Sequence, residues 1–133
     1  MRSIHCRIIQ FNNMAEHNEL GTLGEELALK HLRENGYYIH ETNWRFGKDE
    51  IDIIAEKDGF LVIVEVKTRR SDFFGEPEIF VNATKQRFLV RSTQAYVEKN
   101  NLTLEVRFDI ISIVLNSTTK RINHITDAFY PVL

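Results

Sequence analysis

The sequence contains few of the residues that stabilise small secreted or zinc-stapled folds. It has a single cysteine, Cys6, with two prolines and six glycines among 133 residues. One cysteine excludes an intramolecular disulfide and any zinc site built on cysteines, and it is typical of proteins of the reducing cytoplasm. We therefore expect a cytoplasmic protein that is stabilised by an apolar core, for which the chain is long enough.

Long apolar runs are also missing. The longest, residues 60–64, is far too short to cross a bilayer, so we expect no membrane association. Residues 1–13 lack the apolar stretch and small-residue cleavage site of a secretory signal. Because Met14 opens a more ordinary start, we interpret residues 1–13 as a disordered leader or a mis-assigned start. Residues 14–133 are then expected to form one domain.

An excess of basic residues is absent as well, since the formal net charge is −2. A protein that binds nucleic acid over its whole surface would be basic, so this balance counts against broad non-specific binding. It leaves room for a local basic patch.

The apolar periodicity predicts the element order α-β-β-β-α-β-β, which favours an α/β fold with a mixed sheet flanked by helices. Thr22 and Glu25 have the spacing of a capping box and predict the start of the first helix, which Gly36 ends. Strand 60–68 is apolar almost throughout, as expected of a strand covered on both faces. The expected strands are 37–45, 50–56, 60–68, 104–115 and 121–126, and the second helix spans about 81–100.

The Asp58-Gly59 pair predicts a two-residue hairpin turn, which fixes the register of the flanking strands. Asp52 then lies directly opposite Glu65 on one sheet face, with Cβ atoms roughly 4.5–5.5 Å apart. Lys67 points to the same face, opposite Glu50. A longer loop or a bulge would move Asp52 away from its partner.

Two facing carboxylates destabilise a sheet unless something compensates their charge. A divalent cation would do so, and oxygen ligands suit Mg²⁺, with Mn²⁺ as a substitute. With Lys67 beside the metal, Asp52 and Glu65 form a candidate catalytic set for phosphodiester hydrolysis. The alternative is an exposed, salt-bridged strand end, because an isolated Glu-x-Lys is common.

At these residues the chain resembles the restriction-endonuclease-like, or PD-(D/E)xK, superfamily, whose pattern is an acidic residue followed by acidic-x-Lys on the next strand. It resembles more closely the uncharacterised bacterial UPF0102, or YraN, family. The match covers about residues 20–115, with Lys48-Asp49 as a departure before Glu50. The matching segments are Gly21 to Ala28, Glu50-Ile51-Asp52, Val64 to Arg69 and Arg107-Phe108-Asp109.

This resemblance implies an αβββαβ core similar to that of archaeal Holliday-junction resolvases. It implies that Glu25, on the first helix, lies near the metal, and that branched or damaged DNA is the substrate. Since resolvases act as dimers, it also implies a homodimer. A capping role for Glu25 is equally open and does not exclude metal binding.

Positive charge follows the candidate catalytic strand, at Arg69, Arg70, Lys85, Arg87 and Arg91. These residues could contact the phosphate backbone of DNA or form a solvated surface. The leading interpretation is a Mg²⁺-dependent DNA endonuclease. A non-catalytic nucleic-acid-binding module and a protein-interaction subunit remain alternatives. We expect Trp44 and Phe46 to pack in the core, and the histidines to be structural or exposed.

Overall fold

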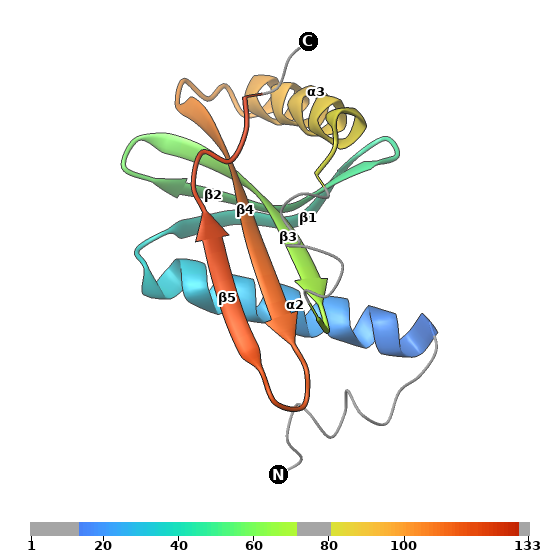
Figure 1. Ribbon diagram of the computed structural model, residues 1–133. Coiled ribbons are helices and arrows are strands. Elements are labelled where there is room, and N and C mark those ends of the chain that lie inside the picture. Colours follow the sequence, from blue (N-terminus) through green and yellow to red (C-terminus); the bar gives the residue numbers. More distant parts are fainter. Residues whose placement is uncertain (1–13, 72–80, 131–133) are drawn as a thin grey trace.

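The computed structural model describes residues 14–71 and 81–130, so the interpretation of residues 1–13 lies outside the described residues. The predicted element order is confirmed: a five-stranded sheet lies between two helices (Figure 1). This layering is compatible with the αβββαβ core. The elements are α2 (Met14–Glu34), β1 (Tyr38–Phe46), β2 (Asp49–Lys57), β3 (Phe60–Arg69), α3 (Ala83–Lys99), β4 (Glu105–Leu115) and β5 (Lys120–Ile125).

The strands follow one another across the sheet in the order β1-β2-β3-β4-β5. All neighbours are antiparallel except β3 and β4, which run parallel and are connected through α3. A parallel pair needs such a crossover, because a tight turn can only reverse the chain. The connection places α3 on the sheet face opposite α2 (Figure 1).

Two apolar clusters cover the two faces of the central strands. Val62 and Val64 of β3 belong to the cluster under α2, whereas Leu61 and Ile63 belong to the cluster under α3. All four side chains are buried, which confirms that β3 is covered on both faces. None of the described helices is long and apolar enough to cross a membrane.

The hairpin turn is as predicted, and so is the register of the ladder next to it, whereas the predicted pairs Asp52–Glu65 and Glu50–Lys67 are not ladder pairs. Asp58 and Gly59 both have positive φ angles, 52° and 85°, as the two central residues of a type I′ turn require. Lys57 faces Phe60, and the ladder continues in the predicted register up to Ile53 opposite Val64.

The predicted capping box is wrong. Helix α2 begins at Met14, so Thr22 lies inside it, and the Thr22 hydroxyl donates to the carbonyl oxygen of Asn18 at 3.0 Å. The apolar periodicity becomes visible only from Leu20, which is why the sequence suggested a later start. Glu25 is therefore in the middle of a helix and has no capping role.

Gly24 brings the middle of α2 close to β3. A Cβ atom at Gly24 would lie 1.9 Å from the Thr68 hydroxyl oxygen, so only glycine fits at this contact. The close approach fixes where the next residue, Glu25, stands relative to the end of the β2–β3 hairpin.

Candidate active site

The candidate site lies where the β2–β3 ladder ends. The last pair of the ladder is Ile53 with Val64, and Asp52 follows directly beyond it. The backbone N–H of Val66 donates to Asp52 Oδ2 at 2.8 Å. A carboxylate thus takes the place of a strand carbonyl at this point of the hairpin.

Asp52 lies close to the second predicted carboxylate. Burial raises the pKa of Asp52 well above its ordinary value, the charge of Glu65 raises it further, and a hydrogen bond to the Glu65 side chain adds to both effects. The Val66 N–H opposes this shift by stabilising the ionised form. The structure therefore brings the two carboxyl groups together, although they do not form a ladder pair in the described register.

Glu65 is the most buried acidic group of the site, with 3% of its surface exposed. Its Oε2 lies 3.5 Å from Lys67 Nζ and 3.6 Å from Lys85 Nζ. Its Oε1 is buried without a hydrogen-bond partner within the described part of the chain. A buried carboxylate oxygen without a partner is costly, and a bound cation would remove that cost.

Glu25 and Asp52 line the same pocket, of about 280 Å³, under α2. Partial burial raises the pKa of Glu25, a hydrogen bond with Asn43 lowers it, and the charge of Glu50 raises it. The pocket wall continues along β3 through Val66 and Thr68. The structure thus places the helix glutamate and the hairpin aspartate on one cavity.

These donors suit a hard divalent cation, because carboxylate oxygens are the ligands that Mg²⁺ and Mn²⁺ prefer. Within residues 14–71 and 81–130, however, no three acidic, histidine or cysteine side chains gather closely enough to form a complete metal site. What fits a cation is the unpartnered oxygen of Glu65 next to the Asp52 carboxyl group. Lys67 and Lys85 already compensate part of the charge of Glu65.

The five basic residues proposed for DNA contact have different surroundings. Lys85 reaches into the site, as its contact with Glu65 shows. Arg91 binds buried Asp49 through Nε and Nη2, at 3.1 and 2.7 Å, and so anchors β2 to α3. Arg87 is exposed and contacts Thr84 on its own helix.

Arg69 and Arg70 are exposed at the end of β3, and Arg69 lines the pocket that holds Glu25 and Asp52. Glu50, expected opposite Lys67, forms an ion pair with Arg45 at 3.1 Å.

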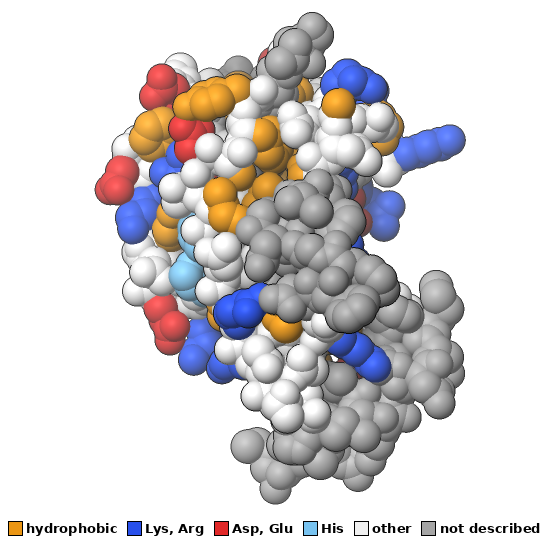
Figure 2. Space-filling view, in the orientation of Figure 1, with side chains coloured by type: hydrophobic (Ala, Val, Ile, Leu, Met, Phe, Trp, Pro, Cys, Tyr) orange, Lys and Arg blue, Asp and Glu red, His pale blue; other side chains and the backbone are white. Residues whose placement is uncertain are grey.

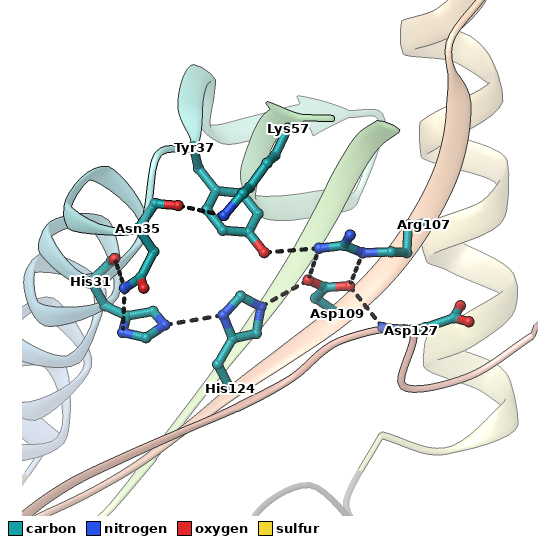
Figure 3. A network of polar contacts seen from close by, with 8 residues as sticks. All are labelled: His31, Asn35, Tyr37, Lys57, Arg107, Asp109, His124 and Asp127. Carbon is teal, nitrogen blue, oxygen red and sulfur yellow. Dashed lines mark hydrogen bonds and ion pairs between the residues drawn. The ribbon is translucent and has the colours of Figure 1, made fainter. Parts of the chain in front are cut away.

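A buried polar network lies away from this site, and the sequence reasoning missed it (Figure 3). Asp109 is fully buried and accepts hydrogen bonds from Arg107 Nε and Nη2, at 2.9 and 2.8 Å, from His124 Nε2 at 2.8 Å and from the Asp127 N–H at 3.0 Å. His124 Nδ1 lies 3.0 Å from His31 Nε2 on α2. The Arg107-Phe108-Asp109 motif was the available signal, but spacing alone gave it no role.

Burial alone would raise the pKa of Asp109, but hydrogen bonds from His124, Arg107 and the Asp127 N–H outweigh it, and the pKa lies below its ordinary value. Burial and the charge of His124 lower the pKa of His31, which Glu34 partly opposes. The network ties β4 and β5 to the C-terminal end of α2. The expectation that His31 and His124 are structural agrees with these contacts.

Comparison with known proteins gives one consistent family. Residues 24–113 match the family described as "Uncharacterised protein family UPF0102". The UPF0102 protein of Flavobacterium psychrophilum is 53% identical over 117 residues, which cover 88% of this chain and 98% of the relative. The UPF0102 protein of Bacteroides thetaiotaomicron is 48% identical over 120 residues, covering 90% and 99% of the two chains.

Proposed function

The chain belongs to the uncharacterised protein family UPF0102, and we propose that it is a metal-dependent endonuclease that hydrolyses phosphodiester bonds in DNA. One observation carries the proposal. Asp52 and Glu65 converge at the end of a hairpin, with an unpartnered buried oxygen of Glu65 and the Lys67 ammonium group beside them.

Asp52 and Glu65 would hold Mg²⁺ or Mn²⁺, with Glu25 contributing from the shared pocket. When bound, such a cation polarises a phosphate and lowers the pKa of a water molecule. The raised pKa of Asp52 means that this carboxyl group must give up its proton before it can act as a metal ligand.

Lys67 and Lys85 act on the phosphate in this proposal. Both ammonium groups lie within 4 Å of Glu65, so a phosphate held beside that carboxylate has two positive charges near it. Charges fixed in a partly buried site stabilise the negative charge that develops on the phosphate oxygens during hydrolysis. Lys67 is the more enclosed of the two, since 26% of its side chain is exposed compared with 35% for Lys85.

A non-catalytic DNA-binding module is a second candidate. One observation favours it: Lys67 and Lys85 already compensate part of the charge of Glu65. Branched or damaged DNA as the substrate, and a homodimer as the active form, are proposals that rest on the resemblance to resolvases. A cytoplasmic location is proposed from the single cysteine.

A cleavage assay tests the proposal. Labelled single-stranded, duplex, flap and four-way DNA are incubated with Mg²⁺ or Mn²⁺ and with wild type, Asp52→Ala, Lys67→Ala or Glu34→Gln. Glu34 is an exposed helix carboxylate paired with Lys30, so its variant is a matched control. We expect metal-dependent cutting that the first two variants lose and the control keeps. Binding without cutting by folded wild type would favour the non-catalytic module.

A further inference from the structure

A second pocket lies next to the candidate active site, between the end of the β1–β2 hairpin and α3. Its volume is about 320 Å³, and it is lined by Lys48, Asp49, Glu50, Lys85, Phe88, Leu89 and Arg91. Lys85 belongs to both places, since it lines this pocket while its Nζ lies 3.6 Å from Glu65 Oε2. A molecule in the pocket would therefore lie beside the candidate catalytic carboxylates.

The acidic groups of this pocket are already paired. Asp49 is bound by Arg91 and by the Ser92 hydroxyl, at 2.7 and 3.3 Å, and Glu50 is bound by Arg45. Two lysines remain. Lys85 is shared with Glu65, and Lys48 forms no ion pair with the part of the chain that the structure describes. The pocket thus offers the positive charge of two lysines to an anion.

Phe88 supplies an aromatic surface in the same pocket. It is 39% exposed, and the Arg91 guanidinium group lies 4.9 Å from the centre of its ring. A single exposed phenylalanine is ordinary on a protein surface. A phenylalanine in a pocket that is lined by lysines, one of which also contacts Glu65, has the combination that binds unpaired nucleotides, in which bases stack on aromatic rings and cations follow the backbone.

The surrounding surface agrees with this combination. Lys and Arg side chains gather at the upper right of the face shown in Figure 2, near α3 and the β1–β2 hairpin. Phe46, directly opposite Asp49 in that hairpin, is 42% exposed and lies parallel to Trp44 with ring centres 6.4 Å apart. Trp44 in turn packs on Tyr96 of α3. The partly buried Trp44 therefore supports the Phe46 ring, and the expectation that Phe46 itself packs in the core is wrong.

We propose that this pocket binds one unpaired nucleotide of a DNA strand, with its base stacked on Phe88 and its phosphates near Lys48 and Lys85. The pocket is at the lower limit of small-molecule sites, so it suits a single nucleotide and not a duplex. The choice of DNA rests on the proposed function. The inference adds a substrate preference, namely DNA with a single-stranded or frayed segment next to the bond that is cut.

Binding without metal separates this inference from catalysis. Fluorescence anisotropy in EDTA measures the affinity of the full chain for a labelled oligothymidylate and for a duplex of equal length. We expect Phe88→Ala to weaken single-strand binding about tenfold, since stacking of one base contributes about 1–3 kcal/mol. Phe88→Trp should retain binding, as should Tyr38→Ala, a control for an exposed aromatic on β1. Lys48→Ala should make the affinity for the single strand less sensitive to salt, by about the amount that the loss of one phosphate contact predicts.

Several outcomes would overturn the inference. The first is failure of wild type to bind the single strand, and the second is tighter binding of the matching RNA. The inference would also fail if Phe88→Ala and Tyr38→Ala weakened binding equally, or if Phe88→Ala weakened single-strand and duplex binding equally. If Phe88 proves not to contribute to binding but the chain still cuts DNA, the nuclease proposal stands. A Phe88 effect in a chain that cuts nothing would support the pocket and refute the nuclease.

Discussion

Replacing Asp109 by asparagine tests whether the buried network holds the molecule together. Asparagine has the shape of aspartate but carries no charge, and one of its two polar atoms is a donor. Asp109 is fully buried and accepts four hydrogen bonds. In the asparagine variant, the amide NH₂ group would have to face at least one of the groups that now donate to the carboxylate. Arg107, 16% exposed, would then lose its counter-ion.

Removing one partner of a buried ion pair costs about 3–5 kcal/mol of unfolding free energy. For a chain of this length such a loss corresponds to a decrease in Tm of roughly 10–20 °C. Glu56→Gln is the control, because the contact of Glu56 with His40 is partly exposed and should contribute about 1 kcal/mol or less.

The dependence on pH gives a further check. Because the folded-state pKa of Asp109 lies below its ordinary value, its stabilising effect is fully present above about pH 4 and is lost as the pH falls through the folded-state pKa. The difference in Tm between wild type and Asp109→Asn, measured by circular dichroism, should therefore shrink in acid. A loss below 1 kcal/mol at pH 7, or one that is independent of pH, would refute this reasoning. Partial recovery in Arg107→Met/Asp109→Asn would support it.

Two other variants examine the candidate site. Gly24→Ala should lower the free energy of unfolding by about 1–3 kcal/mol, because the added methyl group overpacks against Thr68. Adding Thr68→Ala should restore part of this loss, as measured by thermal unfolding. An unchanged Tm in Gly24→Ala would contradict the contact. Asp52→Asn should raise Tm at pH 8 without metal, because the folded-state pKa of Asp52 is raised, so that wild-type stability falls as the pH rises through it. The same variant should lose the Mg²⁺-induced gain in unfolding free energy, which is about 2.7 kcal/mol in wild type at 100 times Kd. An equal Mg²⁺ effect in both proteins would place the metal elsewhere.

The fold could be predicted from the sequence because its determinants are local. Asp58-Gly59 permits one turn type, and that turn fixes which residues of β2 and β3 face each other. The apolar run from Leu61 to Val64 indicated a strand covered on both faces. The start of α2 could not be placed in the same way, because its first turns precede the apolar periodicity that identified the helix.

The candidate site could be predicted only in part. The turn register brought Asp52 and Glu65 to neighbouring positions, but it could not show that Val66 would donate to the aspartate beyond the last ladder pair. The approach of Lys85 depends on how α3 crosses the sheet, which spacing along the chain does not determine. The Asp109 network joins residues from α2, β4 and β5, whose contacts arise only when the sheet is complete.

The parallel pairing of β3 with β4 has a consequence for the order of folding. The β2–β3 hairpin closes over two residues, whereas pairing Phe60 with Glu105 must first enclose all of α3. Hairpins form within microseconds, whereas pairing strands that are far apart in the sequence costs more loop-closure entropy. The two site carboxylates are therefore expected to meet before Lys85 arrives from α3. During that interval Lys67 and the Val66 N–H, both on the hairpin itself, compensate the charge of the two carboxylates without Lys85.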